Sequence, residues 1–157
     1  MCTAKKIMLK LVYDHHITAP ADVVWEVTTG FSDYGAWNSF TPACDAELRP
    51  GAPITMTVKL GRRVIRQTES VSEVVPPSLF EYRMKPLGPF LRSYRQHRIT
   101  AAGPKETQYQ SVFVLYGWLS PIVGWLMAKD LKAGFERMSR ELKKRAESVA
   151  AQRANSD

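Results

Sequence analysis

The chain has 157 residues, 45% of them hydrophobic and 24% charged, which are ordinary values for one globular domain with a buried core. Its formal net charge of +7 suits an anionic ligand, a membrane surface or nucleic acid, so charge alone selects none of them. The cysteines, Cys2 and Cys44, do not indicate a disulfide framework because Cys2 lies at a terminus, and we expect a reduced, cytoplasmic compartment.

Two stretches bear on membrane targeting, and both argue against it. The N-terminal lysines are followed by only a few apolar residues, too few for a signal peptide. Residues 112–128 carry no charge, but the stretch is shorter than a span of about 20 residues and is broken by Ser120-Pro121. We therefore expect a soluble protein.

The N-terminal part of the chain predicts one strand followed by two short helices. Residues 7–17 alternate between apolar and polar, as in a half-buried strand, and residues 18–20 end it. A short helix is predicted at residues 21–29 and a second short piece at 32–37. From Asp45 onward the pattern predicts about six strands at hairpin spacing, separated by Gly and Pro turns, with clear bounds at residues 54–60, 63–75, 79–85, 93–101 and 107–116.

A long C-terminal helix is predicted at residues 120–149. Ser120 is suited to the N-cap and Pro121 to the first helical position. Apolar residues then recur in steps of three and four, so they form one face of a helix about 45 Å long. The face consists of Met127, Leu131, Phe135, Met138, Leu142, Ala146 and Val149. We expect one domain at residues 1–149 and a disordered tail at 150–157.

Segregated strands and helices predict the α+β class. The expected fold is a helix-grip arrangement, in which a curved antiparallel β-sheet wraps around the long C-terminal α-helix, with two short helices after the first strand. Such a sheet leaves a hollow against the helix wherever facing side chains do not fill it.

Four segments carry a resemblance to a known family. The opening run is ITAPADVVWEVTTGFSDYGAWNSF at residues 17–40, and the later pieces are SEVVPPSLFEY at 72–82, YRQHRIT at 94–100 and GWLSPIVGWLMAKDLKAGFERM at 117–138. Together they resemble the SRPBCC (START-like, Bet v 1-like, helix-grip) superfamily, in its polyketide cyclase/dehydrase and lipid-transport branch. The resemblance implies a cavity for a hydrophobic or amphipathic small molecule. It implies no single activity, because the superfamily includes carriers, cyclases and receptors without a shared catalytic triad.

Strand parity selects the first candidate polar residues. His97 shares a face with Arg95, and Tyr109 and Phe113 face likewise on the next strand. If these faces line the cavity, Arg95 and Tyr109 could orient a carbonyl or carboxylate, and His97 could transfer a proton near neutral pH. The alternative is that His97 is a hydrogen-bonded structural residue or lies on the outer face of the sheet.

Glu69 is the second acid–base candidate. It shares parity with Ile65 and Val71, and burial among apolar neighbours would raise its pKa. The alternative is a solvated carboxylate that pairs with Arg63 or Arg95.

Other ligand contacts are expected along the walls. The resemblance places Trp37 and Asn38 in a turn near the cavity, where a structural role is an equal alternative. Met56, Tyr82, Phe135 and Met138 are wall candidates that could equally be plain core. The stretch from Trp118 to Leu126 is apolar on every side, which suits a gate over the cavity, a membrane-docking patch beside Lys129 and Lys132, or a self-association surface. We favour the gate.

No other chemistry is indicated. The three histidines lack metal-ligand spacing, and the sequence contains no Gly-rich phosphate loop, nucleophile elbow or nucleic-acid module. We therefore expect no metal, no cofactor and no nucleic-acid partner.

The leading hypothesis is a protein that binds a hydrophobic small molecule, such as a lipid, isoprenoid quinone or aromatic polyketide-like compound. A second hypothesis is a cyclase or dehydratase that uses His97 or Glu69 as acid or base. A third is a module that docks on a membrane or partner through residues 118–126.

Overall fold

The computed structural model describes residues 7–157, and its elements follow the predicted order. The chain starts with β1 (Ile7–Ile17), α1 (Ala21–Thr29), the 3-10 turn η1 (Phe31–Asp33) and α2 (Tyr34–Trp37). Six strands and one helix follow: β2 (Ala43–Ala46), β3 (Pro53–Leu60), β4 (Arg63–Val75), β5 (Leu79–Arg83), β6 (Arg92–Gly103), β7 (Glu106–Tyr116) and α3 (Ser120–Ala154). The predicted α+β class is confirmed.

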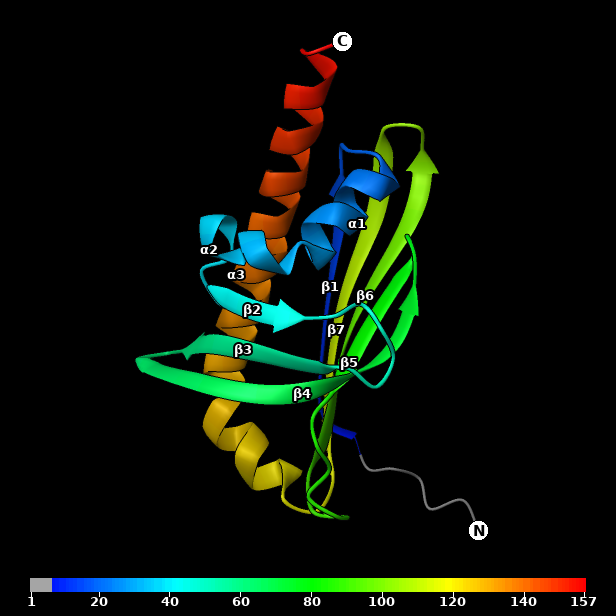
Figure 1. Cartoon of the computed structure of the whole chain (residues 1–157). Helices are drawn as coiled ribbons and strands as arrows, with labels where there is room; N and C mark the ends of the chain where they lie inside the picture. Colours follow the sequence, from blue (N-terminus) through cyan, green and yellow to red (C-terminus); the bar gives the residue numbers. More distant parts are fainter. Residues whose placement is uncertain (1–6) are drawn as a thin grey trace.

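The strands form one antiparallel sheet of seven strands, in the order β1-β7-β6-β5-β4-β3-β2. Strands β2 to β7 are joined as successive hairpins, whereas β1 pairs with the last strand, β7. Figure 1 shows the sheet curling around one side of α3. Helices α1 and α2 lie beside α3, above β2 in this view. This is the expected helix-grip architecture.

Alternating burial along the strands follows the alternating sequence. In β3, Ile54, Met56, Val58 and Leu60 are buried, whereas the residues between them are more exposed. In α3, the predicted apolar face packs inward through Leu131, Phe135, Met138, Leu142 and Ala146. These side chains contribute to two cores, one around Phe135 against the sheet and one around Leu142 against α1.

Two glycines permit close approaches that position α3. Gly117 has φ +114°, and a Cβ there would lie 2.5 Å from the carbonyl oxygen of Phe90, so this turn before the helix suits glycine. Within the helix, a Cβ on Gly134 would overlap the ring of Phe40. The ring of Phe40 thereby reaches Phe135, with an edge-to-face centroid distance of 5.1 Å.

Several boundaries differ from the predictions. Ser120 is not the N-cap: it is the first helical residue, and its hydroxyl donates to the Gly117 carbonyl at 2.6 Å. The helix continues to Ala154, so residues 150–154 are helical rather than part of a disordered tail. Strand β5 ends at Arg83, two residues early.

The structure tests the expectations about the cysteines and about membrane targeting only in part. Cys2 lies outside the described residues, whereas Cys44 is a half-buried free thiol whose pKa burial raises to about 12. None of the helices within residues 7–157 is both long enough and apolar enough to cross a membrane.

Candidate ligand cavity

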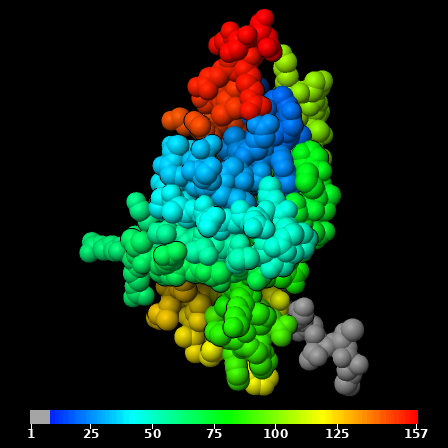
Figure 2. Space-filling view, viewed as in Figure 1, coloured from blue at the N-terminus to red at the C-terminus, as the bar shows by residue number. Residues whose placement is uncertain are grey.

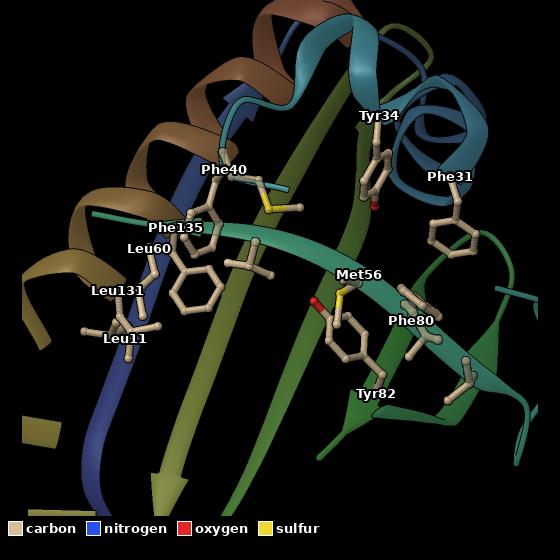
Figure 3. Packing of buried hydrophobic residues seen from close by; sticks show 14 residues of the cluster. Leu11, Phe31, Tyr34, Phe40, Met56, Leu60, Phe80, Tyr82, Leu131 and Phe135 are labelled. Carbon is tan, nitrogen blue, oxygen red and sulfur yellow. The ribbon is translucent and has the colours of Figure 1, made fainter. Parts of the chain in front are cut away.

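A cavity of about 190 Å³ lies between the curled sheet and the N-terminal half of α3. Most of its lining is apolar and comes from β3, β4, β7 and α3. The apolar lining residues are Phe40, Met56, Val58, Leu60, Ile65, Met84, Leu91, Phe113, Leu115, Val123, Met127, Leu131 and Phe135. In Figure 3, Phe40 and Phe135 lie beside α3, while Met56 and Tyr82 reach toward them from the sheet.

The cavity opens where the sheet is incomplete. Strand β5 pairs with β4 only as far as the Ser70–Arg83 pair, so the earlier part of β4 has no partner on that side among the described strands. Glu69, Met84 and Ser93 border this gap and line both the cavity and an open groove outside it. A ligand could therefore enter between β4 and the start of β6.

Arg95 supplies a positive charge to the cavity wall. Its side chain on β6 is 2% exposed, and its guanidinium carbon lies 4.4 Å from the centroid of the Phe135 ring. It donates to the hydroxyl of Ser111 and, at 3.4 Å, to the carbonyl of Val112. Its Nε has no hydrogen-bond partner, and within residues 7–157 no carboxylate lies within 4 Å of its guanidinium. A buried cation without a counter-charge attracts an anionic or strongly polarised oxygen.

Glu69 faces the same cavity from β4, as its strand parity suggested. Burial raises the pKa of its carboxyl from 4.5 to about 7, and the positive charge of Arg95 partly opposes this shift. Its Oε1 accepts a hydrogen bond of 3.0 Å from Gln67. The expected alternative, an ion pair with Arg63 or Arg95, is absent from the described residues. Near neutral pH this carboxyl can either give or accept a proton.

His97 and Tyr109 form a buried pair next to Arg95 and Ser111. The Nδ1 of His97 lies 2.6 Å from the Tyr109 hydroxyl, and the imidazole stacks on Phe80 at 5.9 Å between ring centroids. Burial lowers the pKa of His97 well below its ordinary value, and the charge of Arg95 adds to this effect, so the ring is neutral at pH 7. Neither residue lines the cavity. His97 points inward, and its Nδ1 fits the hydrogen-bonded structural alternative, whereas its buried Nε2 has no partner among the described residues.

The other predicted contacts divide into two groups. Met56, Tyr82, Arg95, Phe113 and Phe135 line the cavity, together with Glu69. Met138, Trp37, Asn38 and Trp118 do not line the cavity. The sulfur of Met138 lies 3.8 Å from the guanidinium of Arg95, and Trp118 is exposed. Trp37 packs on Tyr34, and Asn38 accepts a hydrogen bond from the Thr41 amide.

Sequence reasoning missed several wall residues. Parity alone could have added Ser93, which precedes Arg95 by two positions, and Leu115, which follows Phe113 by two. Phe40 and Thr41 lie in an irregular segment, where no periodicity points to a cavity. In the stretch 118–126 the cavity-lining residue is Val123, while Trp125 is exposed on the helix and Trp118 is exposed in the turn before it.

The fold and cavity define a helix-grip protein with an internal apolar chamber. The family described as polyketide cyclase/dehydrase and lipid transport matches residues 8–147, and the chain belongs to this family. No curated protein matches the chain at the sequence level.

Solved structures share the fold at low sequence identity. The Zhui aromatase/cyclase from Streptomyces sp. R1128 is similar with a TM-score of 0.70 and 18% identity, over 93% of this chain and 95% of that one. A START superfamily protein from Mycobacterium smegmatis gives a TM-score of 0.69 and 17% identity, over 89% and 98% of the two chains. Norcoclaurine synthase from Thalictrum flavum, in complex with dopamine and hydroxybenzaldehyde, gives 0.62 and 15%, over 87% and 84%.

Proposed function

We propose that the cavity binds a small apolar or amphipathic molecule and holds an oxygen of that molecule, as carbonyl or carboxylate, against Arg95. The observation that carries this proposal is the buried guanidinium in a largely apolar wall, with an Nε that lacks a hydrogen-bond partner. Leaving such a group unpaired is costly, whereas a charge-assisted hydrogen bond to a ligand would offset the cost.

The size of the cavity limits the part of the ligand that it buries. Its volume of about 190 Å³ is comparable to that of an apolar cavity of about 150 Å³ that binds benzene, and smaller than the roughly 300 Å³ at which drug-sized sites begin. The buried portion is therefore about one aromatic ring or a short acyl chain, and a longer ligand extends through the gap beside Glu69. Aromatic compounds named with the similar norcoclaurine synthase structure agree with this size.

Calorimetric titration with benzoate, benzaldehyde and toluene tests this proposal, because the three share one ring and differ in the oxygen. We expect benzoate and benzaldehyde to bind more tightly than toluene, and Arg95→Met to remove the difference. Arg98→Met is the matched control, since Arg98 is exposed on the same strand. Equal affinities for all three compounds in the unmodified protein would refute the role of Arg95.

A second candidate function is proton transfer, and the raised pKa of Glu69 favours it. A carbonyl compound held by Arg95 could lose a proton from its α-carbon to the Glu69 carboxylate. The C–H bond breaks, an O–H bond forms on Glu69, and the resulting enolate oxygen is stabilised by the guanidinium. This half-reaction is common to cyclisation and dehydration, the activities in the description of the family.

Exchange of the α-protons of a one-ring ketone with deuterium, followed by nuclear magnetic resonance, tests the second function. We expect Glu69→Gln to abolish the exchange without weakening binding of benzaldehyde. Exchange at the same rate in Glu69→Gln would leave the protein as a binder alone.

A further inference from the structure

An apolar patch lies outside the cavity, at the end of the molecule where α3 begins. It consists of Phe90, Trp118, Leu119, Ile122, Trp125 and Leu126, and we call it the tryptophan patch. Trp118 is 77% exposed and Trp125 is 82% exposed. Soluble proteins rarely expose large apolar side chains together in one contiguous patch unless the patch binds something. In Figures 1 and 2 the first turns of α3 and the loop between β5 and β6 lie together at this lower end.

The patch is held in a fixed shape by the backbone beneath it. The amide of Leu119 donates to the carbonyl of Phe90 at 2.8 Å, and the rings of Phe90 and Trp118 meet edge to face at 6.1 Å between centroids. Gly117 brings the two segments into contact, because a larger residue would collide with the Phe90 carbonyl. On α3, Ile122 and Trp125 lie three residues apart and so share one face, and Trp118 lies in the turn just before the helix.

The charges around the patch have one sign. Lys129 and Lys132 continue the helix face of Trp125, at i+4 and i+7, and both are exposed. Lys85 and Arg92 flank the loop that carries Phe90. The sequence has no Asp or Glu between Tyr82 and Lys105, or between Thr107 and Lys129. The nearest helical acid, Asp130, lies against the β3–β4 turn, where its carboxylate would meet a Cβ on Gly61.

We infer that the tryptophan patch docks on an anionic lipid bilayer. Tryptophan rings with an apolar body and a polar N–H are favoured at the bilayer interface, and lysines beside them are attracted to anionic headgroups. A protein partner explains this surface less well, because no acidic residues are interspersed among its cations. Docking also places the cavity near the lipid, because Val123 and Met127 line it from the inner side of the same helical turns.

Co-sedimentation of the full chain with two kinds of vesicle tests this inference. One kind contains phosphatidylcholine with phosphatidylglycerol, the other phosphatidylcholine alone, and no cavity ligand is added, so the result does not depend on the proposed function. We expect binding to the anionic vesicles, weakened by salt. Trp118→Ser and Trp125→Ser should each weaken it about tenfold. Val64→Ser is the matched control, because Val64 is 67% exposed on β4, outside the patch.

Lysine substitutions test the contribution of charge to vesicle binding. Lys129→Gln and Lys132→Gln should each weaken binding to anionic vesicles about fivefold, whereas Lys144→Gln, an exposed lysine further along α3, should not. Equal binding to both kinds of vesicle, or no loss in the tryptophan variants, would overturn the inference. So would sedimentation velocity showing a dimer that the tryptophan substitutions dissociate, because a second copy of the chain would then occupy the patch.

Discussion

The guanidinium of Arg95 lies over the ring of Phe135, with 4.4 Å between the guanidinium carbon and the ring centroid. One group comes from the sheet and the other from α3, so the contact joins the two halves of the cavity wall. A cation over a ring face is stabilised by the negative charge of that face, more strongly where water is excluded. This contact allows a buried arginine to be tolerated without a carboxylate.

The first prediction concerns how Arg95 affects the free energy of unfolding. Arg95→Met removes a buried charge and keeps similar volume and apolar contact with Phe135 and Met138. We expect the free energy of unfolding to stay the same or rise by about 1–3 kcal/mol, measured by urea denaturation. Binding of benzoate should fall about tenfold to a hundredfold. A variant that is both unfolded and unable to bind would show that Arg95 serves the fold instead.

The second prediction follows from the pKa of Glu69, which folding raises from 4.5 to about 7. Between these values the native state binds more protons than the unfolded state, so the free energy of unfolding must fall as pH rises. We expect a loss of about 2 kcal/mol between pH 4.5 and 7, after allowance for solvent near the rim of the cavity. Denaturation curves at several pH values should show that Glu69→Gln removes this slope. Glu73→Gln, at an exposed site on the same strand, should retain it.

The third prediction separates the His97–Tyr109 pair from the cavity. Tyr109→Phe leaves the buried Nδ1 of His97 without its partner at 2.6 Å, which should lower the free energy of unfolding by about 1–3 kcal/mol. Because neither residue lines the cavity, the affinity for benzoate should not change. Lost affinity at unchanged stability would instead assign this tyrosine to the binding site.

The fourth prediction compares two buried glycines of α3. Gly134→Ala would place a Cβ on the ring of Phe40, and we expect overpacking to cost about 1–3 kcal/mol despite the better helix propensity of alanine. The same change at Gly124 meets only ordinary contacts of 3.9 Å and should stabilise the protein by about 1 kcal/mol. Thermal unfolding checks both variants. A smaller side chain in Phe40→Leu should reduce the penalty at position 134.

Periodicity predicted the architecture because most elements here are half-buried. Strand β4 and helix α1 were predicted with the bounds that the structure shows, since Gly61 and Pro76-Pro77 flank the strand and Pro20 and Gly30 flank the helix. The first turn of α3 was harder: serine before proline indicates a cap, yet the Gly117 turn sets the start and Ser120 is already helical. Local sequence signals cannot register such a tertiary contact.

The site was predictable only as far as strand parity reaches. Parity placed Arg95 and His97 on one face without deciding whether that face is inner or outer, and both residues are buried. It could not show that the cavity ends before His97, because Phe80, Tyr82 and Tyr109 surround the imidazole and fill that part of the interior. The extent of a cavity depends on which side chains meet across the sheet, and those side chains are far apart in the sequence.

The pairing of β1 with β7 has a consequence for biosynthesis. During synthesis β1 must wait for residues 106–116 before it gains its neighbour, and α3 follows them in the chain. Until then the nascent chain exposes the apolar face of β1 and a sheet with no helix to cover it. We therefore expect this domain to depend on chaperones during synthesis, and to fold only after α3 has emerged from the ribosome.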